Sequence, residues 1–299
     1  MKAKATGTAQ TEPANSAELD RAARELFAGF SQIVLVANSD DSNVDQIARS
    51  FPEGTLFVFF NKVYKILGSS FTRPAMLVCR SGMMGANIVH RREVSTVLDF
   101  FDSSDFRGVL NIAIGQEERF SPKEAFEGAP VKHLHLGKLL SAYYPENKVP
   151  TTGFGLCMWL LSQDLPASIH LAGFSAKRSE QWKVFDVHDW TFEQVLIRLL
   201  YRDGKIFIHD APRKNPYQEI SEHFPQFSPA TVALTTDEIL SERMMGLSSV
   251  IDRLMSITKV LRYIDSKFRK IRPRTRKQKH IARTAAADRE VDQTPTGKI

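Results

Sequence analysis

Cysteine is scarce in this sequence, and long apolar runs are absent. Cys79 and Cys157 are its two cysteines, and both lie in apolar surroundings without the spacing of a metal site. This pattern predicts buried thiols in a reducing compartment and excludes a disulfide-rich secreted fold. No stretch reaches the roughly 20 apolar residues that a spanning helix requires. Residues 1–15 are polar, so we expect neither a signal peptide nor an anchor, and a cytoplasmic location.

Glycine is missing from the turn that follows the first apolar run. Residues 32–37 contain the apolar, largely β-branched run I-V-L-V, as in a strand covered on both faces. The polar turn 38–42 then leads into an expected helix at 44–49. Because a dinucleotide-binding fingerprint needs glycines in this turn, the sequence excludes one. A strand, a polar turn and a helix still form an arrangement that places a ligand at the carboxyl end of a parallel sheet.

Apolar runs of strand length alternate with helical patterns along most of the chain. Further strands are expected at 55–60, 75–79, 109–114, 131–136, 168–174 and 205–208, and helices after Ser16 and at 94–101, 154–161 and 215–224. A hydrophobic content of 42% is ample for a core. The pattern predicts an α/β fold, a three-layer Rossmann-like sandwich with a mostly parallel sheet.

One loop has the features of an anion-binding helix start. Pro150 disfavours helix in the residue before it, so the helix should begin near Thr151 or Thr152, and either threonine can cap it. Gly153 allows close approach to the free amides of the first turn. An anionic group can rest there, because these amides and the helix dipole both favour negative charge.

A second loop ends in a histidine just before another helix. His188 precedes a helical pattern, and Glu193 lies on the first turns of that helix. The apolar positions of the pattern are Phe192, Val195, Leu196, Leu199 and Leu200. A carboxylate five residues after a histidine can hold it in one tautomer, so that it serves as a base near neutral pH. A lone histidine is also often a capping or surface residue.

The order of these pieces resembles the sialyltransferase superfamily of the eukaryotic type. The chain reads P-T-T-G, then an apolar helix, a strand ending H-L-A-G-F, and H-D-W-T-F-E. The small and very short motifs of the family match at Pro150, Thr151, Thr152, Gly153, Gly173, Phe174, His188 and Glu193. The large motif matches at Asn38, Ser39, Phe60 and Asn61. Ala37 stands where the family has a glycine, and Phe59 where it has an arginine.

The resemblance implies an inverting glycosyltransferase that uses a CMP-activated acidic keto sugar, either sialic acid or Kdo. It implies that His188 is the general base and that Glu193 orients this histidine or its helix. The nucleotide would lie between Asn38, Ser39, Asn61 and Gly173 on one side and the turn of Thr151, Thr152 and Gly153 on the other. No cofactor or divalent metal is expected beyond the CMP-sugar donor and a glycan or lipid-linked acceptor. The family's further histidine is missing, and Lys177, Arg178 or Lys183 can supply its positive charge.

Two alternatives to this interpretation remain. The chain can be a non-catalytic accessory or binding protein that keeps the fold, since it departs from the family at Ala37, Phe59 and the missing histidine. Asn38 and Asn61 can simply close turns at strand ends. His133 and His135 share one face of an expected strand, but a metal site needs a third ligand and none has suitable local spacing.

The chain divides by composition into four regions. We expect a disordered N-terminus at 1–15, the nucleotide-sugar-binding domain at 16–235, an amphipathic helical extension at 236–272 and a basic, mostly disordered tail at 273–299. The helical seam consists of Leu247, Val250, Leu254, Ile257, Leu261, Ile264, Phe268 and Ile271. Residues 259–283 contain 11 lysines or arginines and one acid, so this segment carries +10 and the rest of the +6 chain −4.

Three interpretations of the basic segment 247–283 remain open. A basic amphipathic helix can lie on an anionic membrane surface, which would place the protein on the inner membrane face. The seam can instead form a coiled coil in a homo-oligomer or pack on its own domain. Nucleic acid is the least favoured partner, because the charge comes without aromatic interleaving or a known motif.

Overall fold

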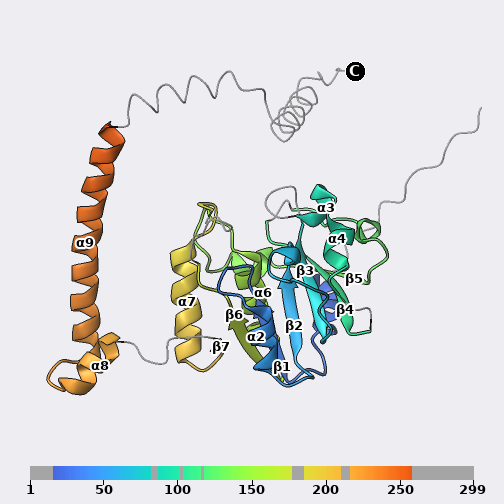
Figure 1. The fold of residues 1–299 in the computed structure, drawn as a ribbon, viewed down its shortest axis with the longest axis horizontal. Helices are drawn as coiled ribbons and strands as arrows, with labels where there is room; N and C mark the ends of the chain where they lie inside the picture. The colour runs from blue at the N-terminus through green and yellow to red at the C-terminus, as the bar shows by residue number, and fades with distance from the viewer. Residues whose placement is uncertain are drawn as a thin grey trace, which may run out of the picture. The chain divides into compact units, whose positions relative to one another are not determined.

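The computed structural model describes residues 16–81, 87–101, 104–115, 118–176, 185–209 and 216–257. They belong to two compact units that divide between Ala211 and Pro212. The first unit holds a seven-stranded sheet in the order β5-β4-β3-β2-β1-β6-β7, and every pair is parallel (Figure 1). The strands are β1 (Gln32–Val36), β2 (Leu56–Phe60), β3 (Ala75–Arg80), β4 (Phe106–Ala113), β5 (Val131–His135), β6 (Ser168–Ala172) and β7 (Phe207–Ile208). The predicted α/β sandwich is confirmed.

The sheet is buried on both faces because its central strands are apolar throughout. Side chains alternate along β1, so that Ile33 and Leu35 enter one core cluster and Val34 and Val36 the other. Helices α1 (Ser16–Arg24), α5 (Gly137–Leu140), α6 (Thr152–Ser162) and α7 (Trp190–Arg202) contribute to the first cluster. The second receives α2 (Val44–Arg49), η1 (Val63–Lys65), α3 (Ile88–Arg91), α4 (Val94–Leu98) and η2 (Lys123–Phe126). Parallel sheets require this covering on both sides.

The direction of winding reverses between β1 and β6. From β1 the chain builds β2 to β5 outward on one side, then returns through α6 to place β6 on the other side of β1. Open α/β sheets bind ligands outside the carboxyl ends of the strands at such a reversal. The segments that follow β1 and β6 begin at Ala37 and Gly173, and the Ala37 amide donates to the Ala172 carbonyl at 2.9 Å.

Helix α6 begins where the proline predicts. Thr151 is its N-cap, with extended backbone angles, and its hydroxyl accepts a hydrogen bond from the Phe154 amide at 3.3 Å. The helix is buried from Phe154 to Leu160, as its nearly continuous apolar sequence requires. Its first turn therefore lies at the carboxyl edge of the sheet and is held there by core packing.

The buried face of α7 includes only part of the apolar pattern. Phe192, Leu196 and Leu200 pack on the core, whereas Val195 and Leu199 are each 53% exposed. Ile197 and Glu193 are buried as well. Glu193 accepts three hydrogen bonds on the side that faces the protein.

The second unit contains α8 (Pro216–His223) and α9 (Pro229–Ile257). The unit boundary therefore precedes the one expected at 235, and Thr235 and Thr236 lie inside α9. A proline is favoured at the first position of a helix, so Pro229 begins α9 instead of ending a domain. Among the described helices, none is long and apolar enough to cross a bilayer. Residues 1–15, the seam beyond Ile257 and the 273–299 tail lie outside the described residues.

Candidate functional site

A buried carboxylate holds the turn at the start of α6. Glu193 is 3% exposed, and its Oε1 accepts hydrogen bonds from the Thr151 amide at 2.7 Å and the Tyr144 hydroxyl at 2.8 Å. Its Oε2 accepts from the Thr151 hydroxyl at 2.6 Å. Burial raises the pKa of Glu193, while the bonds from Thr151 and Tyr144 act in the opposite direction. The carboxylate thus joins α7 to the loop before α6.

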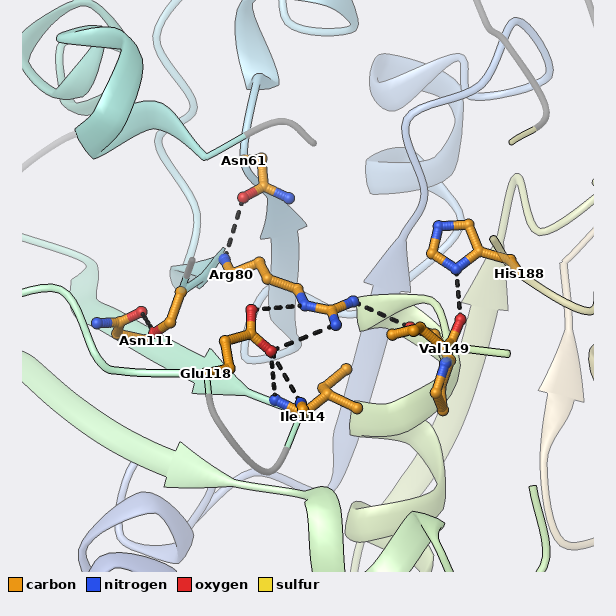
Figure 2. Close-up of polar contacts among 10 residues, drawn as sticks. Asn61, Arg80, Asn111, Ile114, Glu118, Val149 and His188 are labelled. Atoms are coloured by element: carbon orange, nitrogen blue, oxygen red, sulfur yellow. Dashed lines mark hydrogen bonds and ion pairs between the residues drawn. The ribbon is translucent and has the colours of Figure 1, made fainter. Parts of the chain in front are cut away.

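Glu193 does not hold the His188 ring. It was expected to orient this histidine or its helix, and both carboxylate oxygens bond Thr151 and Tyr144, which ties down the helix. His188 is held by the backbone instead: its Nδ1 lies 2.5 Å from the Val149 carbonyl oxygen (Figure 2). A carbonyl accepts and never donates, so the proton is on Nδ1. In the neutral ring, Nε2 then carries a lone pair and can accept a proton.

The environment of His188 favours its neutral form. Burial is the main cause that lowers the pKa of the ring, and the positive charge of Arg80 also lowers it. The bond to the Val149 carbonyl raises the pKa and offsets part of this effect. The rings of His188 and Trp190 pack edge to face, with 5.4 Å between their centroids. At neutral pH the ring is therefore an acceptor of protons.

The loop before α6 and the loop before α7 lie side by side. The Val149 amide donates to the Val187 carbonyl at 2.8 Å, so the segments of chain before α6 and before α7 run together. The Asp189 amide donates to the Tyr144 hydroxyl at 3.1 Å, which in turn donates to Glu193. His188 consequently lies beside the first turn of α6, at the carboxyl edge of the sheet.

The other side of the site consists of the residues after β1 and β2. The Asn38 Nδ2 donates to the Phe60 carbonyl at 2.6 Å, which fixes the orientation of the amide. The Asn38 Oδ1 is buried and accepts no hydrogen bond from the described residues. A buried acceptor without a donor is costly unless a ligand or water satisfies it. Asn61 has a positive φ of 46°, and its Oδ1 accepts from the Arg80 amide at 3.2 Å.

Ser39 and Gly173 meet where β1 and β6 end. The Ser39 hydroxyl lies 3.0 Å from that of Ser42, which donates to the Ala37 carbonyl at 2.6 Å. Gly173 has a φ of +75°, and a Cβ there would lie 2.0 Å from the Ser42 oxygen. An open cavity of about 340 Å³ adjoins this loop and is lined by Asp40, Ser42, Asn43, Val44, Asp45 and residues 66–71. It does not include His188 or Thr151.

Gly153 serves a different purpose from the one expected of it. A Cβ at this position would lie 2.8 Å from the ring of Phe174, so the missing side chain makes room for that ring. The Phe174 ring also contacts Phe60 edge-on, with 6.4 Å between centroids. Within the described part of the chain, the amides of Thr152 and Gly153 donate no hydrogen bond outside their own turn.

Three side chains of the site were missed by sequence reasoning. Tyr144 orders the Glu193 carboxylate, and Arg80 forms an ion pair with Glu118 at 3.1 Å while its Nη1 donates to the Pro150 carbonyl at 3.0 Å (Figure 2). Arg80 ends a buried strand and Glu118 follows the next one. Polar residues at the carboxyl ends of parallel strands were the signal available in the sequence.

The two candidate metal-binding histidines pack on an aromatic ring, and the two thiols are buried. His133 stacks on Phe120 with 4.4 Å between centroids, and His135 meets the same ring edge-on. No cluster of three metal-ligating side chains occurs in the ranges that the structure describes. Cys79 and Cys157 are free and buried, as predicted, and burial raises the pKa of Cys157 to about 12. Lys177, Arg178 and Lys183 lie outside the described residues.

Comparison with known proteins adds no assignment. No protein-family model matches the chain, and no curated protein matches it significantly. The functional interpretation therefore depends on the motifs and on the geometry of the site.

Proposed function

We propose that this protein is an inverting glycosyltransferase that moves an acidic keto sugar, sialic acid or Kdo, from its CMP-activated form to a glycan or lipid-linked acceptor. The observation that carries the proposal is the contact between the His188 Nδ1 and the Val149 carbonyl. It leaves the Nε2 of a neutral imidazole as a base, next to a helix start that suits an anionic leaving group.

The donor is proposed to lie between the two sides of the site. The unsatisfied Asn38 Oδ1 would accept a hydrogen bond from the nucleoside, and Ser39, Asn61 and Gly173 would line the same edge. The amides of Thr152 and Gly153 would face the phosphate. Amides that already point at the site of developing charge need no reorganisation when the phosphate departs.

The reaction would be a single displacement. The acceptor hydroxyl gives its proton to the His188 Nε2 while its oxygen forms a bond to the anomeric carbon. The bond between that carbon and the phosphate oxygen breaks, and CMP leaves with the electron pair. Glu193 would act as a positioning residue, because its hydrogen bonds hold the Thr151 turn and not the imidazole.

Release of CMP tests this proposal directly. Purified protein is incubated with CMP-Kdo or CMP-sialic acid and candidate acceptors, and CMP is quantified. We expect release by the wild-type protein and its loss in His188→Ala, with unchanged thermal unfolding. His90→Ala is the matched control, since His90 is an exposed histidine of α3. CMP release by His188→Ala at the wild-type rate would contradict the assignment of the base.

A second candidate, a non-catalytic accessory protein of the same fold, is favoured by one observation. Phe59, which stands where the resembled family has an arginine, is completely buried in the core and cannot contact a ligand. Calorimetric titration with CMP separates the two candidates. Binding of CMP without turnover of either donor supports the accessory protein, whereas turnover excludes it.

We also propose that the second unit associates with an anionic membrane surface. Leu240, Leu247, Val250 and Ile251 of α9 follow helical spacing and are 49–63% exposed, and the sequence beyond them is strongly basic. Leu240→Gln with Leu247→Gln should weaken sedimentation with vesicles that contain phosphatidylserine. Leu234→Gln, on the opposite side of α9, is the control and should not. Equal binding by all variants would remove this proposal.

A further inference from the structure

Arg80 makes contacts that reach both sides of the site. Its amide donates to the Asn61 Oδ1 after β2, and its Nε and Nη2 donate to the two oxygens of Glu118 at 3.1 and 3.4 Å. Its Nη1 donates to the Pro150 carbonyl at 3.0 Å. The side chains of Arg80 and Glu118 are 17% and 13% exposed, so solvent screens this pair less than a surface pair.

Glu118 is itself fixed to the sheet. Its Oε2 accepts hydrogen bonds from the amides of Ile114 at 2.8 Å and Gly115 at 3.0 Å, directly after β4 (Figure 2). Both ends of the ion pair are therefore anchored at strand termini. The guanidinium occupies a defined position from which it reaches the loop before α6.

Pro150 lies between the residue that holds the proposed catalytic base and the residue that caps α6. Val149 precedes it and holds His188 through its carbonyl, and Thr151 follows it and caps α6. A proline has no amide hydrogen, so the carbonyl is the hydrogen-bonding group that its own backbone offers. We propose that Arg80 is a positioning residue, which holds the Pro150 carbonyl and thereby aims the Val149 carbonyl at His188. This inference rests on the proposed role of His188 as the base.

The charge of Arg80 has a second consequence. Several charged or titratable groups lie on the segments that pack around the imidazole. They are Arg80, Glu118, Tyr144, Lys148, Asp186, Asp189 and Glu193. Among them, Arg80 disfavours a proton on His188 and so lowers the pKa of the ring. A neutral ring is what a general base requires, and the charge of Arg80 favours it, whereas the Val149 contact orients the ring and raises its pKa.

Two substitutions separate the contact from the charge. Arg80→Gln removes both, whereas Arg80→Lys keeps the charge but loses the guanidinium, which donates to Glu118 and Pro150 at the same time. Arg107→Gln is the matched control, because Arg107 lies at the amino end of β4 and packs over Phe30. The measurements are the pKa and the Nδ1 proton signal of His188 by NMR, thermal unfolding, and kcat and KM for CMP release.

We expect Arg80→Gln to weaken the slowly exchanging Nδ1 proton signal of His188 and to lower kcat about 100-fold, the loss typical of a misplaced catalytic group. Arg80→Lys should also lower kcat, and neither variant should change KM by a comparable factor. The pKa of His188 should be higher in Arg80→Gln than in Arg80→Lys, because both variants lose the contact and only Arg80→Lys keeps the charge. Arg107→Gln should change none of these. If Arg80→Gln does not fold, Arg80→Lys carries the test through kcat and the Nδ1 signal.

The NMR measurement distinguishes failure of this inference from failure of the proposed function. If the wild-type protein turns over neither donor, a lost Nδ1 signal in both Arg80 variants would still establish the positioning role. Wild-type values of kcat, pKa and Nδ1 signal in both variants would overturn it. An equal loss of kcat in Arg107→Gln would overturn it as well, because the effect would then be one of general stability.

Discussion

The two sides of the candidate site are built in different ways. On the α6 side, one buried carboxylate accepts three hydrogen bonds and ties Thr151 and Tyr144 to α7. On the β1 side, Asn38 donates to the last residue of β2, Ser39 contacts Ser42 in its own loop, and one buried acceptor has no donor among the described residues. The buried side chains of the first side are satisfied by the protein, whereas on the second side the Asn38 Oδ1 has no donor among the described residues.

This difference separates residues that build the site from residues that would bind. A fully satisfied buried network contributes stability and fixes geometry. An unsatisfied buried acceptor costs stability and is retained where a ligand supplies the donor. Substitutions on the α6 side should therefore act first on folding, and those on the β1 side first on nucleotide affinity.

The largest effect is expected from Glu193→Ala. Removal of the carboxylate leaves the Thr151 amide, the Thr151 hydroxyl and the Tyr144 hydroxyl without their acceptor, so the free energy of unfolding should fall by about 3–5 kcal/mol. Urea unfolding measures it. Glu146→Ala, at an exposed position, is the control and should change stability by less than about 0.5 kcal/mol. A loss below about 1 kcal/mol in Glu193→Ala would contradict the account of this side.

Gly173→Ala should have the next largest effect. An alanine with a φ of +75° costs about 1–2 kcal/mol, and its Cβ would also displace the Ser42 and Ser39 hydroxyls. Gly204 has a φ of +73°, and a Cβ added there would meet no atom within 4 Å, so Gly204→Ala measures the backbone cost alone. The excess loss in Gly173→Ala reports the crowding where β1 and β6 end. Equal losses of unfolding free energy in the two variants would show that the crowding costs no stability.

Asn38→Ala should lower the free energy of unfolding slightly and weaken nucleotide binding strongly. Loss of the bond to Phe60 should cost about 1 kcal/mol. Asn43→Ala is matched to it, since Asn43 caps α2 through the Gln46 amide at 3.1 Å and its loss should cost a similar amount. Calorimetry should show weaker CMP binding for Asn38→Ala alone. Equal affinities in the two variants would remove Asn38 from the binding side.

The smallest effect is the pH dependence contributed by His188. Its pKa is lowered from 6.5 in the folded state, so the unfolded state binds the proton more readily. The corresponding stability is present above about pH 6.5 and is lost as the pH falls from there through the folded-state pKa. Urea unfolding from about pH 8 to about pH 5 should therefore show a steeper acid loss in the wild-type protein than in His188→Gln. Parallel curves would contradict the lowered pKa.

The fold could be predicted from the sequence, but the partners within the site could not. Continuous apolar runs such as residues 33–36 define buried parallel strands, and the proline before Thr151 defines the start of α6. The buried face of α7 could not be predicted from its apolar positions alone, because it includes the charged residue Glu193 and omits Val195 and Leu199. His188 is likewise held by a backbone carbonyl, and backbone groups carry no signature in a sequence.

The position of β6 beside β1 has a consequence for synthesis of the chain. Strands β1 to β5 can pair as soon as each follows the last, but the edge of β1 stays unpaired until the residues up to Ala172 have left the ribosome. Such distant pairings form late and leave an open strand edge in the nascent chain. The rim proposed to bind the nucleotide would thus assemble late in the formation of the first unit, only after β6 has closed that edge.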